Sequence, residues 1–276
     1  MGYRQERTRY NTMCMGLFEI RDEDLEVVDV SRSNRISING TSKGNQLKWY
    51  KDGKFIKLDM LGYEGIAEVM VSYLLSYTTL KKDVDWVEYH QCLVVEEGKL
   101  LGVGCCSLDF RGGLVDISSA KFLRKYGMSF GIGYYDFIDF INDCTGLQCK
   151  NYIDRILCLD SITRNDDRHF NNINFLYDKI NNKYSFAPIY DNGCACLSDL
   201  VSYPITTDFY KNYNSVQAKP FDIDFLYQIH NPLRLCINYT GFIDNINVRS
   251  YNEERAVNTV IKGLEDTKGI SWEEVY

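Results

Sequence analysis

The chain has 276 residues, 45% of them hydrophobic and 25% charged, a balance typical of a globular protein with one large domain or two closely packed lobes. Its net charge of −7 argues against direct nucleic-acid binding, because gripping phosphates requires a basic surface. Its ten Cys include no CxxC pair, no run of about 18 apolar residues could span a membrane, and no secretory leader is seen. We therefore expect a soluble cytoplasmic protein with free thiols, while a secreted effector is left open.

The first 108 residues are predicted to form a β-rich lobe with one helix. Short β-prone runs alternate with turn signals, and the turn at Asp52-Gly53 indicates a hairpin. Apolar residues recur on one stripe between 64 and 77, which predicts a helix there. The predicted strands are residues 25–30, 35–38, 46–50, 55–58, 86–95 and 100–106.

The remaining residues, 109–276, are predicted to form a mainly helical lobe that contains one hairpin. Apolar residues three and four apart indicate the helices. The predicted helices are residues 134–142, 151–162, 221–228 and 253–266, and the predicted hairpin strands are 172–177 and 183–189. The fold class is therefore α+β with two lobes, 1–108 and 109–276, joined by a hinge near 107–110. A cleft between two lobes is a common place for a ligand pocket.

A set of polar residues surrounds the predicted hairpin. Asp167 and His169 follow the helix 151–162, Asn172 comes five positions after Asp167, and Asp191 ends the second strand. Asp and Asn favour turns for local reasons, so each alone could be a turn residue. Phosphoryl transfer from ATP, however, needs one Asp to accept the acceptor hydroxyl proton and an Asp and an Asn on Mg²⁺. The ordered set predicts a phosphotransferase.

The segments Asn-Asp-Asp167-Arg-His169-x-x-Asn172 and Ala-Pro-Ile-Tyr-Asp191 closely resemble the catalytic and metal-binding segments of HipA-like serine/threonine kinases. The Asp-Arg-His-x-x-Asn order is also similar to that of phosphatidylinositol kinases, which share the wider kinase fold. The resemblance implies a bilobal protein-kinase-like fold in which Asp167 is the catalytic base. It further implies that Asn172 and Asp191 hold Mg²⁺ and that His169 supports the loop. Asn192 stands where protein kinases in general have a Phe, a position that HipA-like proteins do not keep as Phe.

The nucleotide side of such a site needs a Lys on a strand, paired with a helix Glu. Lys57 lies within the predicted strand 55–58, and we expect it to bind the ATP phosphates. Glu68 is the predicted partner of Lys57 because it lies among core-facing residues of the helix. Glu64, near the helix N-terminus, is the alternative partner.

A loop ahead of this strand is predicted to cover the phosphates. Its Gly44-Asn-Gln46-x-Lys48 sequence resembles the Gly-x-Gln-x-Lys loop of HipA-like kinases, and we expect Thr41, Ser42, Gly44 and Gln46 to approach ATP. In that family a hydroxyl near this loop can be autophosphorylated, which ejects the loop and inactivates the enzyme. Thr41 or Ser42 is the candidate hydroxyl here. The negative charge of a phosphate on this loop would repel ATP, which would explain the inactivation.

The predicted function is thus an ATP- and Mg²⁺-dependent protein serine/threonine kinase of HipA-like type, with autophosphorylation and a role as a toxin or effector as accompanying hypotheses. Its partners would be a protein substrate with a Ser or Thr acceptor and an antitoxin or small companion protein. The chain would be a compact member without the N-terminal subdomain of full-length HipA toxins. A lipid or small-molecule kinase and a nucleotide-binding pseudokinase are the alternatives.

Overall fold

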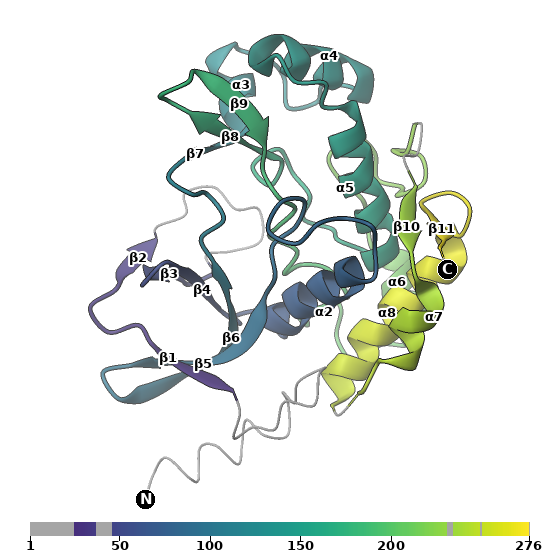
Figure 1. The fold of residues 1–276 in the computed structure, drawn as a ribbon. Helices are drawn as coiled ribbons and strands as arrows, with labels where there is room; N and C mark the ends of the chain where they lie inside the picture. Colours follow the sequence, from purple (N-terminus) through teal and green to yellow (C-terminus); the bar gives the residue numbers. More distant parts are fainter. Residues whose placement is uncertain (1–24, 37–45, 231–233, 249, 276) are drawn as a thin grey trace, which may run out of the picture.

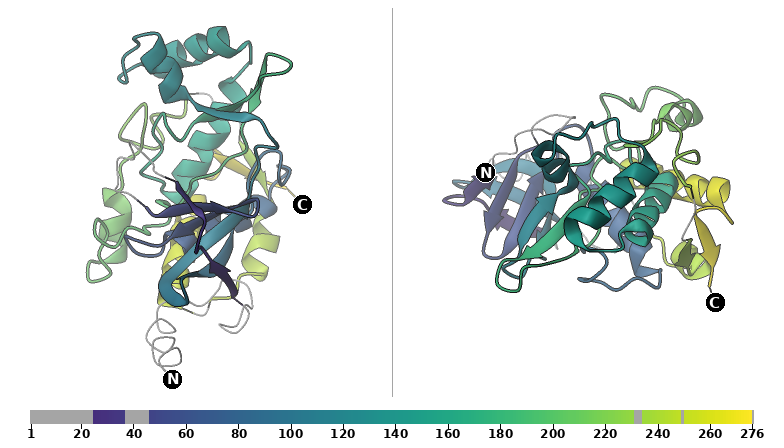
Figure 2. Two further views of the ribbon diagram at one scale, coloured as in Figure 1. Left: turned by 90° about the vertical axis from the view of Figure 1, so that its left-hand side faces the viewer. Right: turned by 90° about the horizontal axis from the view of Figure 1, so that it is seen from above.

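The structure is a computed structural model that describes residues 25–36, 46–230, 234–248 and 250–275. Its first lobe is a six-stranded sheet with one helix across it, and Figure 2, seen from above, shows this sheet lobe beside the helical lobe. The elements of the first lobe (Figure 1) are β1 (Glu26–Asp29), β2 (Asn34–Ile36), β3 (Lys48–Lys51), β4 (Lys54–Leu58), α2 (Glu64–Ser76), β5 (His90–Glu96) and β6 (Lys99–Leu108).

The strand order in this sheet is β1-β5-β6-β4-β3-β2, with β1 parallel to β5 and the other pairs antiparallel. Ile56 and Leu58 pack with Trp49 in a buried cluster on one face. Because side chains alternate along a strand, Lys57 points to the opposite face, where α2 lies. The buried Lys57 side chain therefore points from the sheet toward α2 and the second lobe.

The second lobe is mainly helical and carries two small sheets, β7-β8-β9 and β10-β11. Its elements are β7 (Val115–Ser118), α3 (Ser119–Lys125), α4 (Tyr134–Thr145), α5 (Lys150–Thr163), β8 (Asn174–Asp178), β9 (Lys183–Phe186), α6 (Phe209–Ser215), β10 (Leu235–Ile237), α7 (Tyr239–Asp244), α8 (Tyr251–Thr267) and β11 (Trp272–Glu274). No helix in these described ranges is long and apolar enough to cross a membrane.

Helix α8 connects the two lobes. It begins with a capping box between Ser250 and Glu253, which satisfies two of its free N-terminal amides. It packs against both α5 and α2, and at Gly263 it comes so close to α5 that a Cβ would lie 1.8 Å from the carbonyl oxygen of Ile162. One continuous hydrophobic core consequently runs from α2 through α8 to α5.

This architecture confirms the predicted α+β, two-lobed fold class. The division at residue 108 stays a proposal: β6 ends at Leu108, yet the two lobes share the core around α8. Most predicted elements fall within a few residues of the observed ones, but strand 86–95 is shorter than predicted and begins at His90.

The predicted helix 221–228 is wrong, because these residues form turns instead. Asp222 Oδ1 accepts a hydrogen bond from the Asp224 N–H (2.9 Å), and Asp224 Oδ1 accepts one from the Leu226 N–H (2.7 Å). Such local side-chain bonds compete with the helical backbone ladder. Apolar spacing alone did not reveal them.

The predicted strand 183–189 is too long, since β9 ends at Phe186. Pro188 has no N–H to donate to a ladder. The next residue, Ile189, leaves the hairpin and pairs instead with the segment before β5: its N–H donates to the Asp85 carbonyl (2.8 Å), and its carbonyl accepts from the Val87 N–H (3.1 Å). This departure carries the chain toward Asp191 at the boundary between the lobes.

Candidate active site

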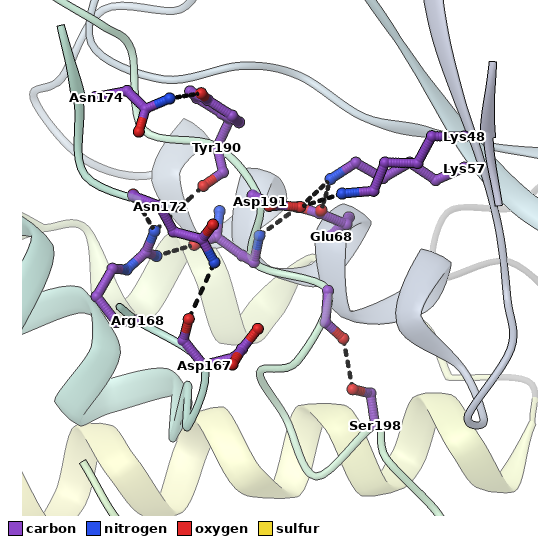
Figure 3. A network of polar contacts seen from close by, with 12 residues as sticks. Lys48, Lys57, Glu68, Asp167, Arg168, Asn172, Asn174, Tyr190, Asp191 and Ser198 are labelled. Atoms are coloured by element: carbon purple, nitrogen blue, oxygen red, sulfur yellow. Dashed lines mark hydrogen bonds and ion pairs between the residues drawn. The ribbon is translucent and has the colours of Figure 1, made fainter. Parts of the chain in front are cut away.

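The loop after α5 is fixed by one buried arginine. Arg168 forms a two-pronged ion pair with Asp160 on α5, with Nε–Oδ2 and Nη2–Oδ1 distances of 2.9 and 3.0 Å. Burial raises the pKa of Asp160, and the guanidinium offsets only part of that rise. Arg168 also donates to the carbonyls of Asn172 (3.1 Å) and Tyr190 (3.3 Å) and to the Asn192 side chain (2.6 Å). It thereby links α5 to its own loop and to the Asp191 loop. Figure 3 shows Arg168 between the two loops.

Asp167 lies at the floor of this loop with its side chain 10% exposed. Its Oδ2 is 3.8 Å from His169 Nε2, and its Oδ1 is 3.8 Å from the Nζ of Lys219. Its backbone is fixed from both sides: the N–H donates to Asn165 Oδ1 (3.1 Å), and the carbonyl accepts from Asn172 Nδ2 (3.0 Å). The carboxylate is thus held in place by its backbone, as a general base requires.

Asn172 and Asp191 both line one cavity of about 330 Å³. The amide nitrogen of Asn172 is committed to the Asp167 carbonyl, which leaves its amide oxygen for a metal ion. Asp191 adopts the left-handed conformation (φ 61°), which Asp tolerates better than most residues. The structure therefore brings the two predicted metal ligands to the same cavity.

Two lysines from the first lobe meet Asp191. Lys57 Nζ lies 2.6 Å from Asp191 Oδ1 and 2.5 Å from Glu68 Oε1, and Lys48 Nζ lies 3.1 Å from Asp191 Oδ1 (Figure 3). Burial would lower the pKa of Lys57, but the carboxylates of Asp191 and Glu68 raise it well above its ordinary value. Burial would likewise raise the pKa of Asp191, but Lys48 and Lys57 hold it well below its ordinary value. The contacts therefore favour the charged forms of Lys57 and Asp191.

The two glutamates of α2 have different tasks. Glu68 bridges the lobes, because its Oε1 pairs with Lys57 while its Oε2 accepts from the Asn192 N–H (2.9 Å). Glu64 instead accepts three backbone N–H groups of the preceding turn, from Met60, Leu61 and Gly62. The structure thus places Glu68, and not Glu64, against Lys57.

The ligand set suits Mg²⁺ rather than an all-protein metal cage. Within the described parts of the chain, no three His, Cys, Asp or Glu side chains cluster as a metal site. Mg²⁺ often takes only one or two protein oxygens and completes its shell with phosphates and water. Asp191 and Asn172 fit that role, and the two ammonium groups now on Asp191 show that this position attracts positive charge.

Aromatic side chains also line this cavity. Phe110 faces Tyr190 with ring centroids 4.7 Å apart, and the Tyr190 hydroxyl donates to Asp116 (2.7 Å). Ser107 and Phe110, from the predicted hinge, line the cavity together with Phe55. Aromatic and charged side chains in one cavity suit the base and the phosphates of a nucleotide.

The phosphate-covering loop is only partly described. Thr41, Ser42 and Gly44 lie outside the described residues, so their predicted contacts with ATP stay predictions. Gln46 is half-buried just before β3 and is not among the residues that line the cavity.

Three residues of the site were not assigned roles from the sequence: Lys48, Arg168 and Lys219. A signal for Lys48 was present, because a two-residue turn at Asp52-Gly53 sets a register that pairs Lys48 with Lys57. The contacts of Arg168 and Lys219 join segments far apart in the chain, so local sequence patterns did not predict them.

Comparisons with known proteins identify solved structures with a similar fold. No protein-family model matches the sequence, and no curated protein matches it. Among solved structures, the chain is similar to the proinflammatory kinase CtkA of Helicobacter pylori, with a TM-score of 0.59 and 14% identity over 87% of this chain and 95% of that one. HipA in the toxin–antitoxin complex with HipB and operator DNA from Shewanella oneidensis MR-1 matches at a TM-score of 0.43 and 14% identity, over 96% of this chain and 63% of that one. The likeness to CtkA confirms the predicted bilobal, kinase-like fold.

Proposed function

We propose that this protein is an ATP- and Mg²⁺-dependent kinase that transfers the γ-phosphoryl group of ATP to a serine or threonine hydroxyl. One observation carries the proposal. Lys57 from the first lobe and Asn172 from the second line a single cavity with Asp191, and the Asn172 side chain donates a hydrogen bond to the backbone carbonyl of Asp167. Turn-forming Asp and Asn residues have no reason to converge in this way with a buried Lys–Glu pair.

Each residue then has a chemical task. Asp167 accepts the proton of the acceptor hydroxyl as its oxygen attacks phosphorus. Lys57, held by Glu68, and Lys48 would exchange their contact with Asp191 for phosphate oxygens. The freed Asp191 carboxylate and the Asn172 amide oxygen would then hold the metal. Mg²⁺, when bound, neutralises charge on the phosphates. Arg168 keeps the loops at fixed positions, and catalysis of this kind depends largely on positioning and charge neutralisation.

Asp167→Asn tests the proposal. We expect turnover of ATP to fall at least 1,000-fold while Mg²⁺–ATP binds about as tightly as in the wild type, since the change removes only the base. The matched control is Asp143→Asn, at an exposed position on α4, which should behave as the wild type. Labelled ATP and phosphopeptide mapping of both variants would measure transfer. A wild-type protein that turns over no ATP with Mg²⁺ present would sink the proposal in favour of a nucleotide-binding pseudokinase.

The same experiment identifies the class of acceptor. Label on Ser or Thr of protein supports the protein-kinase proposal, whereas label on a soluble small molecule or lipid supports the alternative kinases. Phosphate on Thr41 or Ser42 of the wild type, absent from Asp167→Asn, would establish autophosphorylation. The antitoxin or companion partner, the toxin or effector role and the cytoplasmic location stay predictions.

A further inference from the structure

Lys219 lies beside the proposed catalytic base although it comes from a distant part of the chain. It belongs to the segment between α6 and β10, and its Nζ is 3.8 Å from Asp167 Oδ1. The Lys219 side chain is 40% exposed, while that of Asp167 is only 10% exposed. A separation of 3.8 Å is too long for a hydrogen bond. The ammonium group therefore forms an ion pair with the proposed base without a direct hydrogen bond to Oδ1.

The backbone around Lys219 is anchored to the catalytic loop. Phe221 packs on Phe170, a residue of that loop, with ring centroids 5.7 Å apart, and on Phe137 of α4 at 5.3 Å. On the other side, Ala218 is buried and its N–H donates to the Ile223 carbonyl (2.8 Å). The half-exposed Lys219 side chain thus projects from a backbone segment that is packed against the catalytic loop.

Three lysines approach the proposed catalytic residues from two sides, and Lys121 and Arg124 of α3 also line the cavity. Lys48 and Lys57 approach Asp191, where the phosphates of ATP would enter, whereas Lys219 is beside Asp167, where the acceptor hydroxyl would bind. During transfer the negative charge is spread over the oxygens of the moving phosphoryl group, which lies between donor and acceptor. A cation on the acceptor side would stabilise that charge more than it stabilises bound ATP.

We infer that Lys219 is a further catalytic residue, which contacts the phosphoryl group as it passes to the acceptor; the inference rests on the proposed function. In that step the bond from phosphorus to the β,γ-bridging oxygen breaks, and ADP leaves with the electron pair. The bond from phosphorus to the acceptor oxygen forms, and the hydroxyl proton passes to Asp167. Lys219 keeps its proton throughout and gives only charge and a hydrogen bond.

The test uses the whole chain as wild type, Lys219→Gln and Lys219→Arg, with Lys179→Gln as the matched control at an exposed position in the β8–β9 turn. Loss of the γ-phosphate from ATP gives the rate, counted both as free phosphate and as label on protein. Affinity for Mg²⁺–ATP reports the ground state, and affinity for ADP with Mg²⁺ and aluminium fluoride, which imitates the moving phosphoryl group, reports the transition state.

We expect Lys219→Gln to lower kcat about 100-fold, as loss of one preorganised donor does. Its affinity for ADP–aluminium fluoride should fall to a similar extent, with Mg²⁺–ATP affinity within about twofold of the wild type, a pattern that a purely structural role would not produce. Lys219→Arg should recover at least a tenth of the rate, and the Lys179 control should match the wild type.

Two results would overturn the inference alone: a Lys219→Gln rate within about threefold of an active wild type, or a loss of Mg²⁺–ATP affinity as large as the loss of rate. A wild type without any turnover would instead remove the proposed function, and the role of Lys219 with it. The behaviour of the wild type therefore distinguishes the two failures.

Discussion

Two groups of ion pairs lie at the candidate site: Asp160 with Arg168, and Asp191 with Lys48 and Lys57. They differ in how far their side chains can change partners. Asp160 and Arg168 are 0% and 1% exposed, and they form a two-pronged pair. Lys48 and Lys57, 13% and 7% exposed, converge on one oxygen of Asp191, which is 21% exposed and borders a cavity. The first region is closed on all sides, whereas the second opens on the space where a ligand would lie.

This difference separates a structural pair from a functional one. Arg168 also donates hydrogen bonds to the carbonyls of Asn172 and Tyr190. Moving its side chain would break the hydrogen bonds that hold the loop after α5 to the Asp191 loop. Lys48 and Lys57 hold Asp191 through side chains alone, and long side chains can change partners when Mg²⁺ and phosphates arrive. Opposite charges therefore fix the loop after α5 in one region, and in the other they form contacts that the proposed ligands would replace.

Among changes to these two groups of ion pairs, Arg168→Met should reduce stability the most. It leaves the Asp160 carboxylate buried without its partner, a change that typically costs about 3–5 kcal/mol of stability. It also removes the donors that hold the Asp191 loop, so activity should be lost with stability. Urea unfolding followed by circular dichroism would measure the free energy of unfolding.

The double change Asp160→Leu with Arg168→Met sharpens this prediction. Replacing a whole buried pair with apolar groups is often nearly neutral, so most of the stability should return. Activity should not return, because the hydrogen bonds of Arg168 to the two loops are still missing. A single variant that loses under about 1 kcal/mol would contradict a structural role for this pair.

Asp191→Asn should have an intermediate effect and act mainly on binding. We expect Mg²⁺–ATP affinity to fall about 100-fold (about 2.8 kcal/mol) and to lose most of its dependence on Mg²⁺, because a metal ligand is removed. Stability should change much less than in Arg168→Met, since Lys57 keeps Glu68 as its partner. Titration of ATP at several Mg²⁺ concentrations would test this; an unchanged Mg²⁺ dependence would exclude Asp191 as a ligand.

The two regions also differ in how far the sequence predicted them. Asp191 and Lys57 were found because the chemistry of phosphoryl transfer demands those residue types in a known order, and Glu68 followed from its place on the core-facing side of a helix. Arg168 stands in the middle of the recognised segment, but its importance comes from Asp160, Tyr190 and other groups that only the fold assembles.

Secondary structure was likewise predictable only where local sequence patterns determine it. Helix α5 and the β3–β4 hairpin were predictable from local periodicity and turn chemistry, within a few residues. The turns at 221–228 were not, because aspartate side chains and the packing of Phe221 on Phe170 outweigh a helical pattern. Short elements such as β7 and α6 were missed, since pairing with β8 and capping by Asp208 define them more than their own sequence does.

Lys48→Met should give the smallest effect and tests whether the open region rearranges as proposed. If Lys48 moves from Asp191 to a phosphate, the variant loses one charge-assisted hydrogen bond, and ATP affinity should fall about tenfold (about 1.4 kcal/mol). The matched control is Lys51→Met, on the same strand but the opposite face of the sheet, which should bind ATP as the wild type does. Competition with a fluorescent nucleotide would measure both. Equal affinity in Lys48→Met and the wild type would mean that Lys48 only neutralises Asp191 in the free protein, so that Lys57 alone carries the phosphate contact from the first lobe.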